Sequence, residues 1–396
     1  MKAPSRRTNR QGLINILASL LSILGGLLFG FLLLILFNPG NAMYGLNKIL
    51  TTGIANLDKL GKVMYQSAPI LLTGLSVAFA FKTGLFNIGA TGQYTLGAFF
   101  ALVGVIQWRL PWWAALILAM VGGALLGSIP GICKALFNVN EVITSIMFNW
   151  ISLFAVNLCI NNMPLMLANA WGATNKERTV SLIGAPFMEY NPNAIIPRAG
   201  LDKLMNSQYM NIAVFIAIGI ALVIWVVMNR TTFGYELKAC GYNRHASDYA
   251  GINAKRSIIL SMTIAGALAG IGGGLYFLSG TAQYTLVKAL LATGFNGIPV
   301  ALLAGSNPIG TIFSALFISY IQVGGDALQP EYAKEIIDII IAAIIYLSAF
   351  ALLLRGWIGK LFIRKQKENS NRELADLPDT SALPQDAASE QEEAAQ

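Results

Sequence analysis

Charged residues are scarce in this sequence of 396 residues. They make up 12% of it, whereas ordinary globular domains carry about 25%. Hydrophobic residues make up 55%, the mean hydropathy is +0.61, and the apolar residues gather in runs long enough to cross a bilayer. These values exclude an ordinary soluble domain. They predict an all-α polytopic protein of the cell membrane, surrounded by membrane lipid.

Histidine and cysteine are also nearly absent. The only histidine is His245, and Cys133, Cys159 and Cys240 are isolated from one another. The sequence has no CxxC pair, no HExxH motif and no Ser/His/Asp arrangement, so we predict neither a metal site nor a catalytic centre. A GxxxxGK[ST] phosphate loop is missing as well. We therefore predict a protein that is not an enzyme, has no cofactor and does not itself bind ATP by this route.

Ten apolar runs are predicted to cross or enter the membrane. The first is about 25 residues long, which exceeds the roughly 7–15 residues of a signal-peptide core, so we expect it to remain as a helix. The ten runs are Leu13–Phe37, Val63–Phe81, Tyr94–Gln107, Trp112–Cys133, Val142–Ile160, Asn211–Met228, Ser257–Phe277, Leu286–Ala304, Thr311–Val323 and Ile336–Leu354. The seventh run is rich in glycine and alanine, which predicts close helix packing.

Basic residues flank the apolar runs, and membrane orientation explains the formal net charge of +8 without a nucleic-acid partner. The most basic segments are the leader 1–11, the loop 229–256 and the start of the tail 355–396. Six of the predicted spans precede the loop and all ten precede the tail. Both numbers are even, so the three basic segments lie on one side of the membrane, and both termini are predicted to be cytoplasmic. The membrane domain is then 12–354, with 161–210 as an external loop, and the acidic remainder of the tail is predicted to be disordered.

Two polar stretches interrupt the apolar runs, Gly84–Gln93 and Gly294–Gly305. Broken membrane helices in corresponding positions indicate a solute pathway. Tight packing is the alternative, since glycine serves that purpose too, but packing does not require the amide side chains. Amides beside phenylalanine suit a neutral polar solute that contains a ring. We predict a central pathway lined by these broken segments, with Phe86, Asn87, Gln93, Phe295 and Asn296 as its side chains.

Ionisable residues within the runs are few. Glu141, Lys288 and Asp338 all lie near predicted helix ends, where they reach water. Intramembrane charges mark ion and proton pathways, so their absence from the middle of the runs argues against an ion-coupled carrier that works alone. That carrier is the alternative from a different class.

The segment Arg230–Arg256 is the longest polar interruption near the middle of the chain. Apolar positions are spread through it, and Gly234, Gly241 and Gly251 divide it into two or three short helical pieces. A solvated basic loop is the simplest interpretation. The apolar positions favour a docking surface for a soluble partner.

Three segments, in order, resemble bacterial ABC importer permeases for nucleosides. GLFNIGATGQ (Gly84–Gln93) is similar to their G-[LV]-F-N-I-G-x-x-G-Q segment, and NEVITSIMFNWI (Asn140–Ile151) to their N/H-E-V-[IV]-x-[ST]-I-M-x-N segment. TTFGYELKACGYNRHASDYAGI (Thr231–Ile252) resembles their cytoplasmic G-x-x-[LI]-[RK]-A-x-G-x-N-x-x-A-A-x-Y-x-G-I segment, except that the usual Ala-Ala pair reads Ala246–Ser247. The wider family includes permeases for simple sugars and branched-chain amino acids, which stay open as alternative cargo.

The resemblance implies an importer whose partners are an ABC ATPase subunit that binds ATP, a homologous second permease, and an external substrate-binding lipoprotein. The second permease implies a heterodimer, and the solute is small and neutral, a nucleoside. The loop 229–256 becomes the coupling loop, and 161–210 a contact for the binding protein. Glu141 and Asn149 lie in a family segment, and we expect them to have structural roles near the coupling loop. The expected ATPase contacts are Tyr235, Leu237, Gly241, Tyr242, Asn243, Arg244 and Tyr249.

Overall fold

The computed structural model describes residues 6–348 and 350. The chain divides into two units, Ser19–Leu352 and a second made of Met1–Ala18 with Leu353–Gln396. The predicted disordered tail, 355–396, lies outside the described residues. The helix α1 (Arg6–Phe37) includes residues 6–11 of the predicted leader.

The described residues form helices and turns, with two isolated β-bridges and no strand. Among the described residues, seven helices are long and apolar enough to cross a membrane, which supports the multi-pass prediction. They are α1, α3 (Leu57–Lys82), α5 (Trp112–Phe137), α6 (Glu141–Asn161), α9 (Ala213–Arg230), α12 (Ala254–Leu278) and α15 (Pro308–Asp326).

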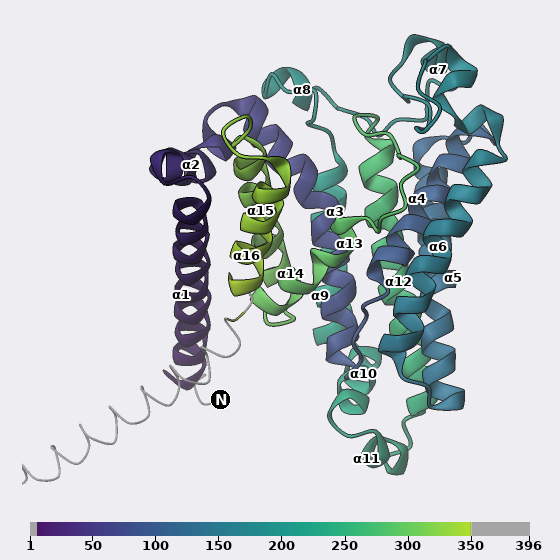
Figure 1. Cartoon of the computed structure of the whole chain (residues 1–396). Helices are drawn as coiled ribbons and strands as arrows, with labels where there is room; N and C mark the ends of the chain where they lie inside the picture. The colour runs from purple at the N-terminus through teal and green to yellow at the C-terminus, as the bar shows by residue number, and fades with distance from the viewer. Residues whose placement is uncertain (1–5, 349, 351–396) are drawn as a thin grey trace, which may run out of the picture. The chain divides into compact units, whose positions relative to one another are not determined.

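Shorter helices complete the described part. The apolar ones are α4 (Ala90–Ile106), α13 (Ala292–Phe295), α14 (Gly297–Leu303) and α16 (Lys334–Ser348). At the end labelled α8 and α7 in Figure 1 lie α2 (Ala42–Thr51), α7 (Ala185–Tyr190) and α8 (Leu201–Leu204), whereas α10 (Thr232–Tyr242) and α11 (Arg244–Tyr249) lie at the opposite end of this unit. The 3-10 turns are Pro39–Asn41, Thr52–Ile54, Pro164–Met166 and Ala168–Trp171.

The predicted eighth run, Leu286–Ala304, is not one continuous helix. Its first residues are extended, and the amide of Leu286 donates to the carbonyl of Glu177 at 2.8 Å. Helix begins only at Ala292 and is divided at Asn296 into α13 and α14. Pro299 lacks the amide hydrogen that would continue a helix across this point. The predicted interruption of the eighth run is therefore confirmed, and its helical part is short.

The packing of α12 confirms the prediction made from its small residues. A Cβ atom built on Gly266 would overlap the carbonyl oxygen of Gly123 in α5, and one built on Gly123 would overlap the carbonyl oxygen of Gly266. Gly270 meets the backbone of Ala119 in the same way. Lipid supplies no hydrophobic drive for helices to associate, so this backbone-to-backbone approach holds α5 and α12 together by van der Waals contact.

We expect Gly266→Ala to destabilise the protein, because the new methyl group meets rigid backbone and not a flexible side chain. Overpacking of this kind lowers the free energy of unfolding by about 1–3 kcal/mol. The measurement is thermal unfolding of the purified protein in detergent. Gly219→Ala in α9 is the matched control, since a Cβ atom there meets nothing within 4 Å. Equal melting temperatures for the two variants would contradict the packing assigned to α12.

Candidate functional site

The segment Arg230–Arg256 folds as two short helices whose ends are capped by its own side chains. The Thr231 hydroxyl accepts from the amide of Gly234 at 3.1 Å and starts α10. The Asn243 side chain accepts from the amide of Ala246 at 3.0 Å and starts α11. Such caps satisfy amides that have no partner within the helix. The prediction of two or three helical pieces is confirmed, but the predicted division at glycines is wrong for Gly234 and Gly241, which lie within α10, because the two helices are divided at Asn243.

One face of α10 is anchored on the membrane helices. Leu237 is completely buried, and α10 packs against α3, α9 and α12. A Cβ atom on Gly241 would collide with the backbone of Thr83 and Gly84 at the end of α3. Leu237 and Gly241 therefore attach α10 to the membrane helices. We remove Leu237 from the predicted partner contacts, because it has no exposed surface.

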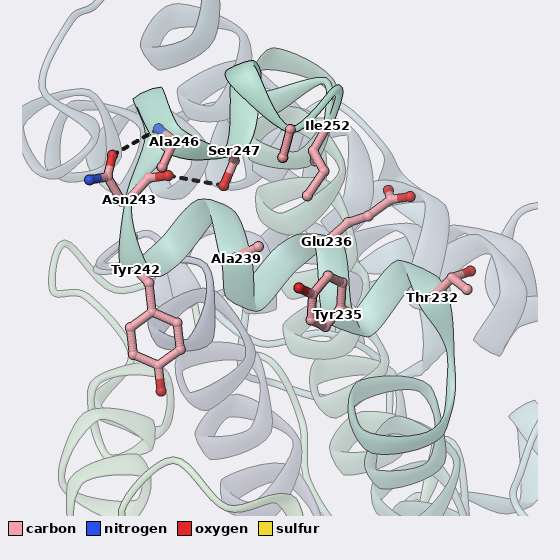
Figure 2. Close-up of a pocket in the computed structure, with 10 residues that line it drawn as sticks. Thr232, Tyr235, Glu236, Ala239, Tyr242, Asn243, Ala246, Ser247 and Ile252 are labelled. Atoms are coloured by element: carbon pink, nitrogen blue, oxygen red, sulfur yellow. Dashed lines mark hydrogen bonds between the residues drawn. The ribbon is translucent and has the colours of Figure 1, made fainter.

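The other face of this segment is open. The side chains of Tyr235, Tyr242 and Tyr249 are 70%, 92% and 95% exposed. A groove of about 620 Å³ runs between α10 and α11, with Tyr235 and Glu236 on one side and Ser247 and Ile252 on the other (Figure 2). A second groove of about 340 Å³ shares Thr232, Glu236 and Ile252 with it. Asn243 is exposed, and Gly241 and Arg244 are half-buried, so six of the seven predicted coupling residues keep some exposed surface, and only Leu237 has none.

The break between α3 and α4 holds a buried pair of amide side chains. The Asn87 amide donates to Gln93 Oε1 at 2.8 Å, and the Gln93 amide donates back to Asn87 Oδ1 at 3.0 Å. The Asn87 amide also donates to the Ser76 hydroxyl at 3.0 Å. Both amides are buried, so in this conformation they bond to each other. Their role in a pathway stays a prediction.

Asn149 fastens α6 to the same break. Its Oδ1 accepts from the amide of Gly92 at 2.8 Å, and its Nδ2 donates to the carbonyl of Ile88 at 3.1 Å. The Ser152 hydroxyl donates to the carbonyl of Gly92 at 2.9 Å. These contacts agree with the structural role expected of Asn149. They lie at the break between α3 and α4, however, and not near the segment of α10 and α11.

Glu141 is the first residue of α6, and the residue before it, Asn140, caps this helix. The Oδ1 atom of Asn140 accepts from the amide of Val142 at 2.8 Å. Glu141 instead forms an ion pair with Lys134 of α5 at 3.0 Å. This ion pair joins α5 to α6, which agrees with the structural role expected of Glu141. Sequence reasoning missed Lys134, although it precedes Glu141 by only seven residues across the turn.

The second broken stretch lies directly against the first. Gly294 is packed on Thr91 of α4, and Gly297 on Thr73 and Gly74 of α3, each too closely for a Cβ atom. Phe86 stacks on Phe81, with centroids 5.1 Å apart, and Phe295 and Asn296 are half-buried. The structure therefore brings the two predicted pathway segments together. The sequence analysis did not single out three tyrosines of the neighbouring helices, Tyr65, Tyr94 and Tyr276. Only the presence of a phenol within an apolar run could have indicated them.

The segment 161–210 is tied to the chain that leads into α13. The amide of Thr179 donates to the carbonyl of Tyr284 at 2.9 Å, and the amide of Tyr284 donates to the Thr179 hydroxyl at 3.0 Å. The Tyr284 hydroxyl donates to Asn157 of α6 at 3.2 Å. Burial raises the pKa of this phenol above its ordinary value, so it remains a donor throughout the physiological pH range.

We expect Asn87→Leu to leave the buried Gln93 amide without a partner and to lower the free energy of unfolding by about 1–3 kcal/mol. The double variant Asn87→Leu/Gln93→Leu removes both amides, so it should lose less stability than the two single variants summed. Thermal unfolding of all four proteins measures this. Strict additivity would show that the two amides do not depend on each other.

The comparisons with known proteins agree with one another. The model of the family described as branched-chain amino acid transport system / permease component matches residues 60–349. The nucleoside ABC transporter permease protein NupB of Lactococcus lactis is 34% identical over 373 residues, which cover 90% of this chain and 97% of NupB. The guanosine ABC transporter permease protein NupP of Bacillus subtilis is 35% identical over 359 residues, 88% and 97% of the two chains.

A second Bacillus subtilis protein, the guanosine ABC transporter permease protein NupQ, is 25% identical over 308 residues, 75% of this chain and 91% of NupQ. No solved structure matches the chain. The family match covers most of the sequence, including both broken stretches and the segment of α10 and α11. The chain is an integral membrane protein and belongs to the family of ABC transporter permease components.

Proposed function

We propose that this chain is the membrane-spanning permease subunit of an ATP-driven ABC importer for nucleosides. The observation that carries the proposal is the coverage of NupB and NupP, a nucleoside and a guanosine permease, each matched over 97% of its length. In this proposal the ten apolar runs cross or enter the membrane with both termini in the cytoplasm. The chain forms half of the path, has no catalytic site or cofactor, and leaves ATP to its ATPase partner.

The segment of α10 and α11 suits docking of that ATPase. Tyrosines are frequent anchors of protein interfaces, and Tyr242 and Tyr249 are almost wholly exposed. The opposite face is fastened by Leu237 and by the contact of Gly241 with the end of α3. Movement of a docked ATPase would therefore displace α10 and α3 together, as a rigid-body step.

The remaining partners are a second permease and an external binding lipoprotein. NupP and NupQ of Bacillus subtilis are both similar to this chain, at 35% and 25% identity, which supports a heterodimer of two homologous permeases. The segment 161–210 is the proposed contact for the binding protein. It holds the chain that leads to α13 through Thr179 and Tyr284.

The test is uptake of radiolabelled guanosine and uridine by cells with and without this chain. We expect uptake that requires the chain and ATP and is lost when ATP is depleted while the ion gradient is kept. ATP-dependent uptake of simple sugars or branched-chain amino acids instead would keep the machinery and change the cargo. Uptake that persists on the gradient alone would favour a stand-alone ion-coupled carrier.

We expect Tyr242→Ala to weaken docking of the ATPase at least about tenfold, the effect of losing an aromatic anchor from an interface. Copurification of the ATPase and nucleoside-stimulated ATP hydrolysis measure this. Tyr44→Ala is the control, because that tyrosine is also exposed but belongs to α2, a helix that lies at the other end of the unit (Figure 1). Normal docking of Tyr242→Ala would exclude this side chain from the interface.

A further inference from the structure

A second polar cluster lies where α13 meets α3 and α4. It contains the side chains of Thr73, Thr91, Tyr94 and Thr293. The Thr73 hydroxyl lies 3.2 Å from the carbonyl oxygen of Thr293 and bonds within its own helix as well. Thr91 and Tyr94 are buried, and neither hydroxyl has a partner within hydrogen-bond geometry; the Tyr94 hydroxyl lies next to the Thr293 side chain without a well-formed bond to it. This cluster is distinct from the amide pair of Asn87 and Gln93, whose groups are paired.

Two unpartnered hydroxyls at one place in a membrane domain call for an explanation. A buried hydroxyl without a partner is unfavourable, and most buried polar groups in proteins are bonded. Phenylalanine and valine have nearly the same shapes as tyrosine and threonine and would fill the same space without that penalty. Oxygens left free in this way are the groups that an incoming hydroxylated solute would satisfy.

Aromatic rings lead from this cluster toward the end of α3 that carries Lys62. Tyr94 lies 6.5 Å from Phe277 by ring centroids, and Phe277 lies 5.1 Å from Tyr276. Tyr276 stacks on Tyr65 at 5.2 Å. The rings thus form a continuous series from the buried Tyr94, and flat π-faces of this kind bind a heterocyclic base by stacking.

The far end of the series is marked by an ion pair. Tyr209 lies 5.9 Å from Tyr65 and is half-buried, and Lys62 pairs with Asp326 at 3.0 Å. Between this pair and Tyr94, Gln66 contributes another buried oxygen without a partner. It lies seven residues before Thr73, hence on the same face of α3. The cluster and its aromatic approach are neutral, which suits an uncharged solute.

We infer that the Thr91 and Tyr94 hydroxyls bind the ribose hydroxyls of a nucleoside, with the tyrosine rings as stacking surfaces along its approach. This assignment rests on the proposed function and adds to it a binding site within one permease chain. The described conformation is closed, since Gly294 of α13 is packed on Thr91. The solute takes the place of α13 when that short helix moves away.

The test uses the variants Tyr94→Phe and Thr91→Val, each of which removes one unpartnered oxygen and keeps the shape. The measurements are the Kd of radiolabelled guanosine for the purified permease–ATPase complex without binding protein, and the thermal stability of the complex. We expect the Kd to rise about two- to tenfold, the loss of one hydrogen bond. Thermal stability should be unchanged or higher, because no bond within the protein is lost.

Tyr332→Phe is the matched control. Its hydroxyl donates to the carbonyl of Asn38 at 3.3 Å, so the control should lose stability and keep the Kd of the wild type. Guanosine lacking the 2′ or 3′ hydroxyl adds a second arm. At least one of these analogues should bind the wild type more weakly than guanosine does, and Tyr94→Phe or Thr91→Val should reduce that difference.

An unchanged Kd in both variants refutes the site. A wild-type complex that imports guanosine but does not bind it in the Kd measurement refutes the site as well. A loss of stability like that of Tyr332→Phe also counts against it, because it would give the hydroxyls a structural role. In each of these cases ATP-dependent uptake by the wild type leaves the proposed function intact. A wild type that neither binds nor imports nucleosides refutes the proposed function, and the site with it.

Discussion

The structure depends on hydrogen-bond partners for the non-helical backbone between α3 and α4, which lies inside the protein. Amides and carbonyls there cannot turn to water, and an unpaired group inside a membrane protein is strongly unfavourable. The side chain of Asn149 provides both an acceptor and a donor: it accepts from the amide of Gly92 and donates to the carbonyl of Ile88. The amide pair of Asn87 and Gln93 fills the space beside it. Because Asn149 belongs to α6, the break is stable only while α6 stays in place.

The break also determines where the second broken stretch lies. Gly294 and Gly297 approach Thr91 and Thr73 so closely that only glycine fits. The chain leading to α13 is held in turn by Thr179 of the segment 161–210, and by Asn157 of α6, whose amide donates to the carbonyl of Val287 at 2.9 Å. The segment 161–210, α13 and the break are thus joined by continuous contacts. Whatever displaces that segment acts on α13.

Local patterns in the sequence predicted the features that depend on local chemistry. Long apolar runs predicted the membrane helices, and small residues predicted the close approach of Gly266 to Gly123. Short helices were also predicted in the segment of α10 and α11, although Asn243 and not a glycine divides them. The predictions from sequence failed where the position of a residue depends on a partner that is distant in the sequence. Leu237, predicted as a partner contact, is buried against other helices, and Leu286 bonds to Glu177, more than a hundred positions away. The unpartnered hydroxyl of Tyr94 has no sequence signature, since pairing is visible only in the folded chain.

Both ends of the break are touched by elements proposed to move. At one end Gly241 of α10 is pressed on Thr83 and Gly84, and at the other Gly294 of α13 is pressed on Thr91. Backbones in such contact cannot slide past one another without separating, because packed interiors change between discrete arrangements. A displacement of α10 by a docked ATPase therefore reaches the break through Gly84, and a displacement of α13 reaches it through Thr91. The six residues between Gly84 and Thr91 are where events on the two sides of the proposed importer meet.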